Sequence, residues 1–77
     1  MKWERIERGS AGLIGVEVYT KKEAKRRYFV KIYVYDTVLK ISGDFDTIKR
    51  KMEEILAAAE ASLEAIEKYQ YTHPEDN

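Results

Sequence analysis

The C-terminal half of the chain carries a helical pattern of hydrophobic positions, which predicts an α-helix over residues 45–69. Large apolar residues recur at spacings of three and four, and this spacing places them on one face of a helix. We name this set the helix stripe: Ile48, Met52, Ile55, Leu56, Ala59, Leu63 and Ile66. Asp44 or Asp46 can cap the helix start. The predicted helix is about 37 Å long, which is longer than a small sheet needs as a cover.

Upstream of the helix, apolar and polar positions alternate with the period of β-strands. The clearest strand covers residues 28–36, where the residues expected to face the helix are Tyr28, Val30, Ile32 and Val34. Further segments with shorter or weaker alternation predict two more strands and an optional edge strand, at residues 13–20, 38–42 and 1–8. Turns are expected at residues 9–12 and 36–37.

These elements predict an α+β fold in which an antiparallel sheet of three or four strands is covered on one face by one long C-terminal helix. Residues 1–71 are expected to form a single domain, and the polar residues 72–77 a disordered tail. One face of such a two-layer fold stays open. The sequence therefore predicts a dimer, formed with a second copy or with a related small subunit.

The open face of the sheet is expected to carry Phe29, Lys31, Tyr33 and Tyr35. Three explanations fit these aromatic residues. They can form a contact with another protein chain, where Tyr and Phe are enriched, or a platform on which the bases of a single strand stack. They can also reflect only the β-propensity of Tyr.

On the helix, Ala58, Ala61 and Ala65 lie beside the stripe and widen its apolar sector. Small residues let another backbone approach closely, which favours a contact surface for a second chain. The same alanines are also explained by their high helix propensity.

A basic segment separates two of the predicted strands and is placed at the tip of a hairpin. It is a solvated loop or a phosphate contact, because clustered cations gain affinity by releasing counterions. The residues of a nucleic-acid site would then be Lys21, Lys22, Lys25, Arg26, Arg27, Lys31 and Tyr33.

Composition narrows the class of protein. The 77 residues suffice for one small core and include no cysteine, so disulfides and cysteine metal ligands are excluded. The net charge is zero, but residues 1–36 hold nine basic and five acidic residues, whereas residues 37–77 hold five and nine. The usage of Lys, Glu, Ile and Tyr resembles that of thermophiles. With no secretion signal or membrane span in the sequence, we expect a cytoplasmic protein.

No residue pattern supports catalysis, a cofactor or a metal site. The single histidine, His73, lies in the predicted tail, so a preorganised general base is not expected. Asp44 and Asp46 are better explained as helix caps than as a catalytic pair. Three serines (Ser10, Ser42 and Ser62) lack a histidine partner. We expect a protein that is not an enzyme and that binds no small-molecule substrate.

The segment Leu39-Lys-Ile-Ser-Gly-Asp-Phe-Asp-Thr-Ile-Lys-Arg50, with Glu64-Ala-Ile-Glu67 further along the helix, resembles one known family. It is similar to the C-terminal half of the small dimerising subunit of the KEOPS complex, which makes threonylcarbamoyl-adenosine in tRNA. That family has a helix between its first two strands, for which residues 21–27 are too short. The resemblance implies a shortened archaeal paralogue that binds the dimerising subunit and has no catalytic role.

A second resemblance is to small single-stranded DNA-binding proteins of the positive cofactor four and ThermoDBP-related type. It is based on Phe29, Lys31, Tyr33 and Tyr35 together with the basic residues 21–27. Those proteins dimerise and use an open sheet face and basic loops. The zero net charge and the acidic residues of the helix argue against this alternative.

Overall fold

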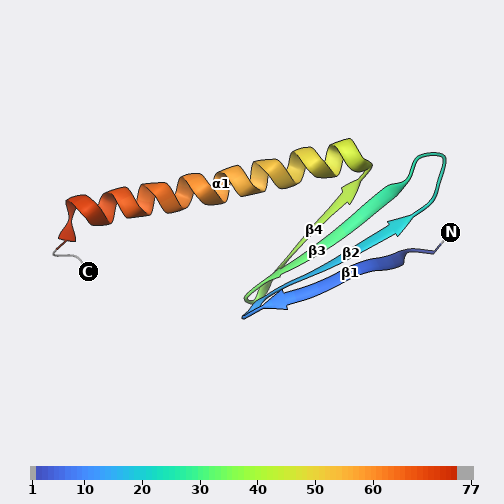
Figure 1. The fold of residues 1–77 in the computed structure, drawn as a ribbon, viewed down its shortest axis with the longest axis horizontal. Coiled ribbons are helices and arrows are strands. Elements are labelled where there is room, and N and C mark those ends of the chain that lie inside the picture. The colour runs from blue at the N-terminus through green and yellow to red at the C-terminus, as the bar shows by residue number, and fades with distance from the viewer. Residues whose placement is uncertain (1, 75–77) are drawn as a thin grey trace.

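A computed structural model describes residues 2–74 as a four-stranded antiparallel sheet followed by one helix (Figure 1). The strands follow one another in the order β1-β2-β3-β4, so each pairs with its neighbour in the chain. The elements are β1 (Glu4–Ala11), β2 (Ile14–Lys21), β3 (Arg27–Val34), β4 (Thr37–Gly43) and α1 (Phe45–Thr72). The predicted α+β class is confirmed, and so are the C-terminal helix and the antiparallel sheet, which includes the optional edge strand.

Strand pairing divides the side chains of the sheet between two faces. Val18 pairs with Val30, which pairs in turn with Ile41, so apolar residues of three strands share one side. This first face also holds Ile14, Val16, Tyr28, Ile32, Val34 and Leu39. The predicted alternation of β3 is therefore confirmed. Within the described residues, Val30 is the buried hydrophobic side chain, at 4% exposure, and the other apolar residues of the first face are partly covered or exposed.

β1 contains a β-bulge at Ile6, which the register with β2 skips. Arg5 pairs with Tyr19, and Glu7 pairs with Val18, the neighbour of Tyr19 in β2. Two steps along β1 therefore correspond to one step along β2. Strict alternation would place Arg5 and Arg8 on opposite faces, because they are three residues apart. The bulge brings both arginines to the second face.

The turn between β3 and β4 lies one residue earlier than expected, and this corrects the placement of Tyr35. β3 ends at Val34, and the turn consists of Tyr35 and Asp36. Tyr35 has φ 57°, a left-handed conformation that L-residues rarely adopt in a strand, and its side chain is 70% exposed. Its backbone N–H donates to the Leu13 carbonyl at 3.2 Å, which ties this turn to the β1–β2 turn.

The helix begins as predicted and continues beyond the expected end. The Asp44 side chain accepts a hydrogen bond from the Thr47 backbone N–H at 3.0 Å, which makes Asp44 the N-cap. Thr72 belongs to the helix rather than to a tail. His73 is half-buried and stacks on Tyr69 with ring centroids 4.0 Å apart, so it is not a solvated tail residue. The disorder predicted for residues 75–77 lies outside the described part of the chain.

The helix covers much less of the sheet than the sequence suggests. It contacts only β3 and β4, and Figure 1 shows it diverging from the sheet after its first turns. Only Thr47, Ile48 and Met52 of the helix are partly covered, and no helical residue is buried. The molecule measures 57 × 24 × 15 Å. Its radius of gyration is 16.7 Å, against about 11.5 Å for a compact domain of this length.

The junction between β4 and α1 depends on Gly43, which has φ 149°. A Cβ atom at this position would lie 2.9 Å from Cγ2 of Thr47. We predict that Gly43→Ala destabilises the fold by more than about 1 kcal/mol, because a steric clash adds to the backbone strain. Gly9→Ala is the matched control, because its Cβ would meet only an ordinary contact at 3.9 Å. Thermal unfolding measures both, and an equal stability of the two variants would contradict the prediction.

Candidate functional site

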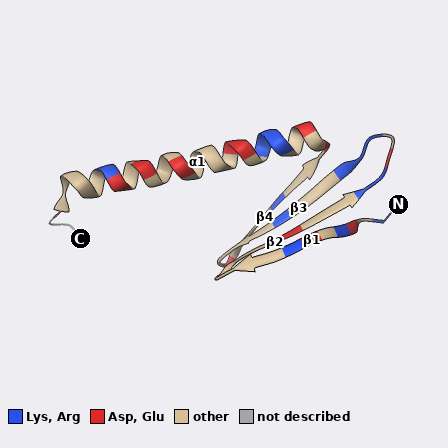
Figure 2. Ribbon diagram, in the orientation of Figure 1, with Lys and Arg blue, Asp and Glu red and all other residues tan. Residues whose placement is uncertain are grey.

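The second face of the sheet gathers basic and aromatic side chains from all four strands and from the residue before β1. Figure 2 shows basic positions along each strand and in the β2–β3 loop. We name this surface the cationic–aromatic face. Its cations are Arg5, Arg8, Lys21, Arg27, Lys31 and Lys40, and its aromatic residues are Trp3, Tyr19, Phe29 and Tyr33. Glu17 is the one carboxylate that the strand register places among them.

Three of the aromatic rings form a connected group that joins the residue before β1 to β2 and β3. The Phe29 ring lies 5.8 Å from the Trp3 ring and 6.1 Å from the Tyr19 ring, measured between centroids. Lys21 Nζ stands 4.8 Å from the centre of the Trp3 ring, and Lys31 Nζ stands 5.8 Å from both Tyr19 and Phe29. Cations at these distances from ring faces are attracted by the π-electrons. The aromatic group and the cations are therefore one surface.

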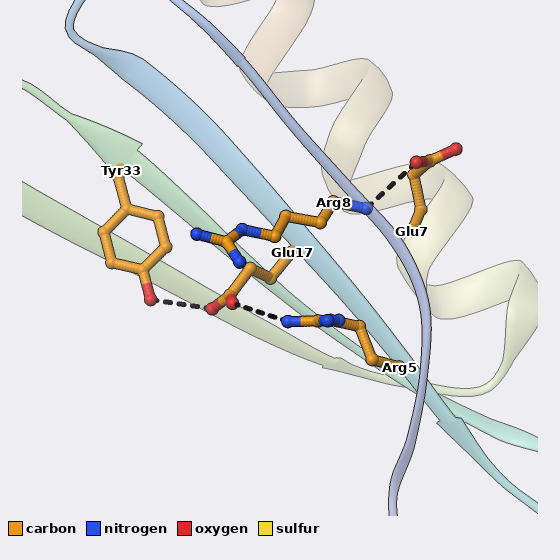
Figure 3. A network of polar contacts seen from close by, with 5 residues as sticks. All are labelled: Arg5, Glu7, Arg8, Glu17 and Tyr33. Carbon is orange, nitrogen blue, oxygen red and sulfur yellow. Dashed lines mark hydrogen bonds and ion pairs between the residues drawn. The ribbon is translucent and has the colours of Figure 1, made fainter.

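Glu17 holds the centre of a polar network on this face (Figure 3). The Tyr33 hydroxyl donates to Glu17 Oε1 at 2.8 Å, and Arg5 Nη1 lies 3.8 Å from Glu17 Oε2. The side chain of Arg8 extends beside them, whereas Glu7 points away. The Tyr33 hydrogen bond, with smaller effects of Lys31 and Arg8, lowers the pKa of Glu17 below its ordinary value. The same hydrogen bond raises the pKa of the Tyr33 phenol.

A recess of about 390 Å³ lies beside this network, above Gly15, which pairs with Tyr33 across β2 and β3. It exists because Gly15 has no side chain to fill the space between β1 and the Tyr33 ring. Arg8, Ser10, Glu17 and Tyr33 line its walls. The recess therefore offers a cation, a carboxylate and an aromatic ring to one planar ligand.

The basic segment between β2 and β3 is a hairpin tip, as predicted, but its charges are partly neutralised. Glu23 lies 3.1 Å from Lys21 and 4.0 Å from Arg27. Lys25 lies 3.6 Å from the helix cap Asp44, and Arg26 Nη1 donates to the Thr20 hydroxyl at 3.1 Å. Lys22 is exposed at the tip. The larger basic surface is thus the second face of the sheet and not the tip alone.

Two apolar surfaces lie on the other side of the sheet and along the helix. The first face has a hollow of about 340 Å³ where the end of β1, the start of β2 and β3 lie together. Ala11, Ile14, Val16 and Ile32 are among the residues that line it. Another of about 400 Å³ runs along the helix at Met52, Ile55, Leu56 and Ala59. Further along the stripe, Leu63 and Ile66 remain 58% and 63% exposed. Tyr28 and Phe45 line one shallow hollow, which places the helix start on the first-face side.

The structure brings together some of the residues expected at an interface and separates others. Phe29, Lys31 and Tyr33 share the second face, as predicted. Tyr35 does not join them, because it lies in the β3–β4 turn. The predicted alanines are exposed and belong to α1, which Figure 1 shows projecting away from the sheet: Ala58, Ala61 and Ala65.

Of the residues that β1, its preceding residue and β2 contribute to the cationic–aromatic face, the sequence interpretation included Lys21 but missed Trp3, Arg5, Arg8 and Tyr19. Tyr19 follows from the alternation of residues 13–20, so its position was available from the pattern. Trp3, Arg5 and Arg8 could be placed only with knowledge of the bulge at Ile6.

Within residues 2–74, no group of His, Asp or Glu side chains has the arrangement of a metal site. Nor does α1 contain an apolar stretch long enough to cross a bilayer. The surfaces described above offer contacts for binding.

The fold and these surfaces define a small α+β protein with a four-stranded antiparallel sheet, one projecting helix and two chemically different sheet faces. Comparison with protein families, curated proteins and solved structures finds no match to the chain.

The Tyr33–Glu17 hydrogen bond gives a prediction for alkaline pH. Because Glu17 raises the pKa of Tyr33, the stability that this bond contributes is present below the ordinary tyrosine pKa and is lost as pH rises through the raised value. Glu17→Gln should therefore lower the Tyr33 pKa towards its ordinary value. An NMR titration of the Tyr33 ring measures this shift. Glu7→Gln should leave the Tyr33 pKa unchanged, and an equal effect of both substitutions would refute the assignment.

Proposed function

We propose that this protein is a non-catalytic assembly subunit that pairs with a second chain of the same fold. The contact consists of the first face of the sheet and the helix stripe. One observation carries the proposal: the helix stripe is largely exposed, and most apolar residues of the first face are only partly covered within their own chain. Val30 is the single buried hydrophobic residue of the described part.

The exposed area supports a partner quantitatively. The accessible surface is 6459 Å², which exceeds by about 1,600 Å² the value for a compact protein of 9.0 kDa. A stable interface of standard size removes about 800 Å² from each partner. The excess is therefore large enough to supply such an interface.

The helix reaches beyond the sheet that precedes it. Its 28 residues span about 42 Å, while an eight-residue strand spans about 26 Å. Leu63 and Ile66 therefore lie past the region where the helix touches β3 and β4. A second chain can receive this part of the stripe, and the adjoining Ala58, Ala61 and Ala65 allow close approach of its backbone.

The charges along α1 favour an antiparallel arrangement of two such helices. The first half of the helix is balanced, with three basic and three acidic residues, whereas the second half has three acidic residues and one lysine: Glu60, Glu64, Glu67 and Lys68. Antiparallel pairing places the acidic half of each copy beside the balanced half of the other, whereas parallel pairing would oppose the two acidic halves. Avoidance of like charges selects the orientation more than it adds affinity.

In its sharper form, the proposal names the dimerising subunit of the KEOPS complex as the partner and the cytoplasm as the location. Its support is the resemblance of residues 39–50 and 64–67, which form β4, the start of α1 and a later part of the stripe. The family's helix has no counterpart between β1 and β2 or between β2 and β3, so a shortened paralogue would lack this helix. Two related chains would then pair with approximate two-fold symmetry.

If two chains pair through the stripe, lysine residues introduced into the stripe should lower the molecular mass measured in solution. Leu56 and Leu63 are 59% and 58% exposed in one chain, so lysine at both positions should hardly alter an isolated chain. In a pair the same lysines would be buried without partners, and the pair should dissociate. Multi-angle light scattering should give twice 9.0 kDa for the unmodified chain and 9.0 kDa for Leu56→Lys/Leu63→Lys.

Tyr71→Lys is the matched control, because Tyr71 is 88% exposed and belongs neither to the stripe nor to the adjoining alanines. This variant should keep the mass of the pair. An unmodified chain of 9.0 kDa that unfolds cooperatively would overturn the proposed assembly. For the sharper form, co-expression with the KEOPS dimerising subunit should yield a one-to-one complex, and separate elution of the two chains would contradict that partner.

A further inference from the structure

We propose that the cationic–aromatic face binds single-stranded nucleic acid, with one guanine base in the recess above Gly15. This function goes beyond assembly, because it uses the opposite face of the sheet. The first face and the helix stripe can therefore be occupied by a partner chain while the second face stays open.

The charge of this face is not a consequence of composition. The whole chain is neutral, yet the strand register places six basic side chains and one carboxylate on this surface. Glu23 of the β2–β3 loop lies near two of these cations, Lys21 and Arg27, so the six cations face two carboxylates. Two acidic residues of β1, Glu4 and Glu7, point to the first face instead. A concentrated set of cations binds the phosphate backbone by releasing its condensed counterions.

The aromatic residues favour a single strand over a duplex. Bases in a duplex already stack on one another, whereas an unpaired base offers its flat face to an aromatic side chain. Trp3, Tyr19 and Phe29 form one group, and Tyr33 lies four residues further along β3, about 13 Å from Phe29. Lys31 stands between them on the same face. Two stacking positions with Lys31 between them suit a nucleic-acid strand that runs along β3.

The recess adds a preference for guanine. An ionised carboxylate only accepts hydrogen bonds, and it has room for about four. Glu17 receives one from Tyr33, interacts also with the Tyr19 hydroxyl and lies near Arg5, and as a wall of the recess it has acceptor capacity left for a ligand there. Guanine presents two adjacent N–H donors on its Watson–Crick edge and fits such a carboxylate. Arg8 lies at the same recess, within reach of the phosphate or the guanine carbonyl.

The test is a fluorescence-anisotropy titration of the full chain with labelled oligothymidylate and oligouridylate of about ten nucleotides. Both strands should bind, and their ratio reports whether DNA or RNA is preferred. Affinity should fall at least tenfold between about 50 and 200 mM salt. The fluorescence of Trp3, the single tryptophan of the chain, should be quenched as a base stacks on it. A duplex of the same length should bind more weakly.

Two charge-matched variants locate the site. Arg8→Ala/Lys40→Ala removes two exposed cations of the face and should reduce the salt slope by about two. Arg50→Ala/Lys68→Ala removes two exposed cations of the helix and should leave the slope unchanged. Circular dichroism verifies that both variants remain folded. Absence of binding to either strand at low salt, or an equal loss in the two variants, would overturn the proposal.

The guanine preference is tested on a thymidylate strand with one central guanine or one central inosine, which lacks the 2-amino group. The unmodified chain should prefer guanine by about tenfold. Glu17→Gln should weaken this preference, and Glu7→Gln should retain it. If the strands bind with no difference between guanine and inosine, the recess assignment is refuted while strand binding stands. The state of assembly is measured separately by light scattering, so the failure of one proposal does not imply failure of the other.

Discussion

The structure depends on the burial of one apolar sheet face, and the chain by itself provides too little cover for that face. β3 contributes Val30, Ile32 and Val34 to it, and β2 and β4 extend it on both sides. The helix touches the sheet only near its own start and then diverges. Because hydrophobic burial is the main favourable term in folding, the partly covered side chains of this face offset less conformational entropy than a fully covered core would. In the proposed assembly, a second chain supplies the missing cover.

The two faces of the sheet separate two kinds of contact. Alternation along β2 and β3 sends aliphatic side chains to one side and aromatic and basic side chains to the other. The bulge at Ile6 extends this separation to β1, since it directs Arg5 and Arg8 to the same face. As a result, the two proposed functions, assembly and the binding of single-stranded nucleic acid, use different surfaces. A subunit with both functions would present nucleic acid to a complex that it joins through its other face.

Much of this architecture is visible in the sequence, because it follows from periodicity. The spacing of the stripe and the Asp44 cap predict the helix, and alternation over residues 28–34 predicts β3 and its two faces. Three features depend on local geometry that periodicity does not encode. They are the bulge at Ile6, the left-handed Tyr35 in the β3–β4 turn, and the angle at which the helix leaves Gly43.

The candidate site illustrates the same limit. Phe29, Lys31 and Tyr33 were predicted on one face, since they belong to a single strand. Their neighbours Trp3, Arg5 and Arg8 come from a strand whose register shifts, so no pattern within β1 alone reveals them. The recess above Gly15 arises only from the pairing of Gly15 with Tyr33. Cross-strand contacts of this kind require the register, which a single sequence does not specify.

The most direct test of the central claim is the midpoint of thermal unfolding as a function of protein concentration. If the first face and the helix stripe are covered by a second chain, folding and association are linked, and the midpoint should rise steadily as the concentration increases. A cooperative transition whose midpoint is the same at all concentrations would contradict the account, since it would show that one chain is stable with these surfaces exposed to water.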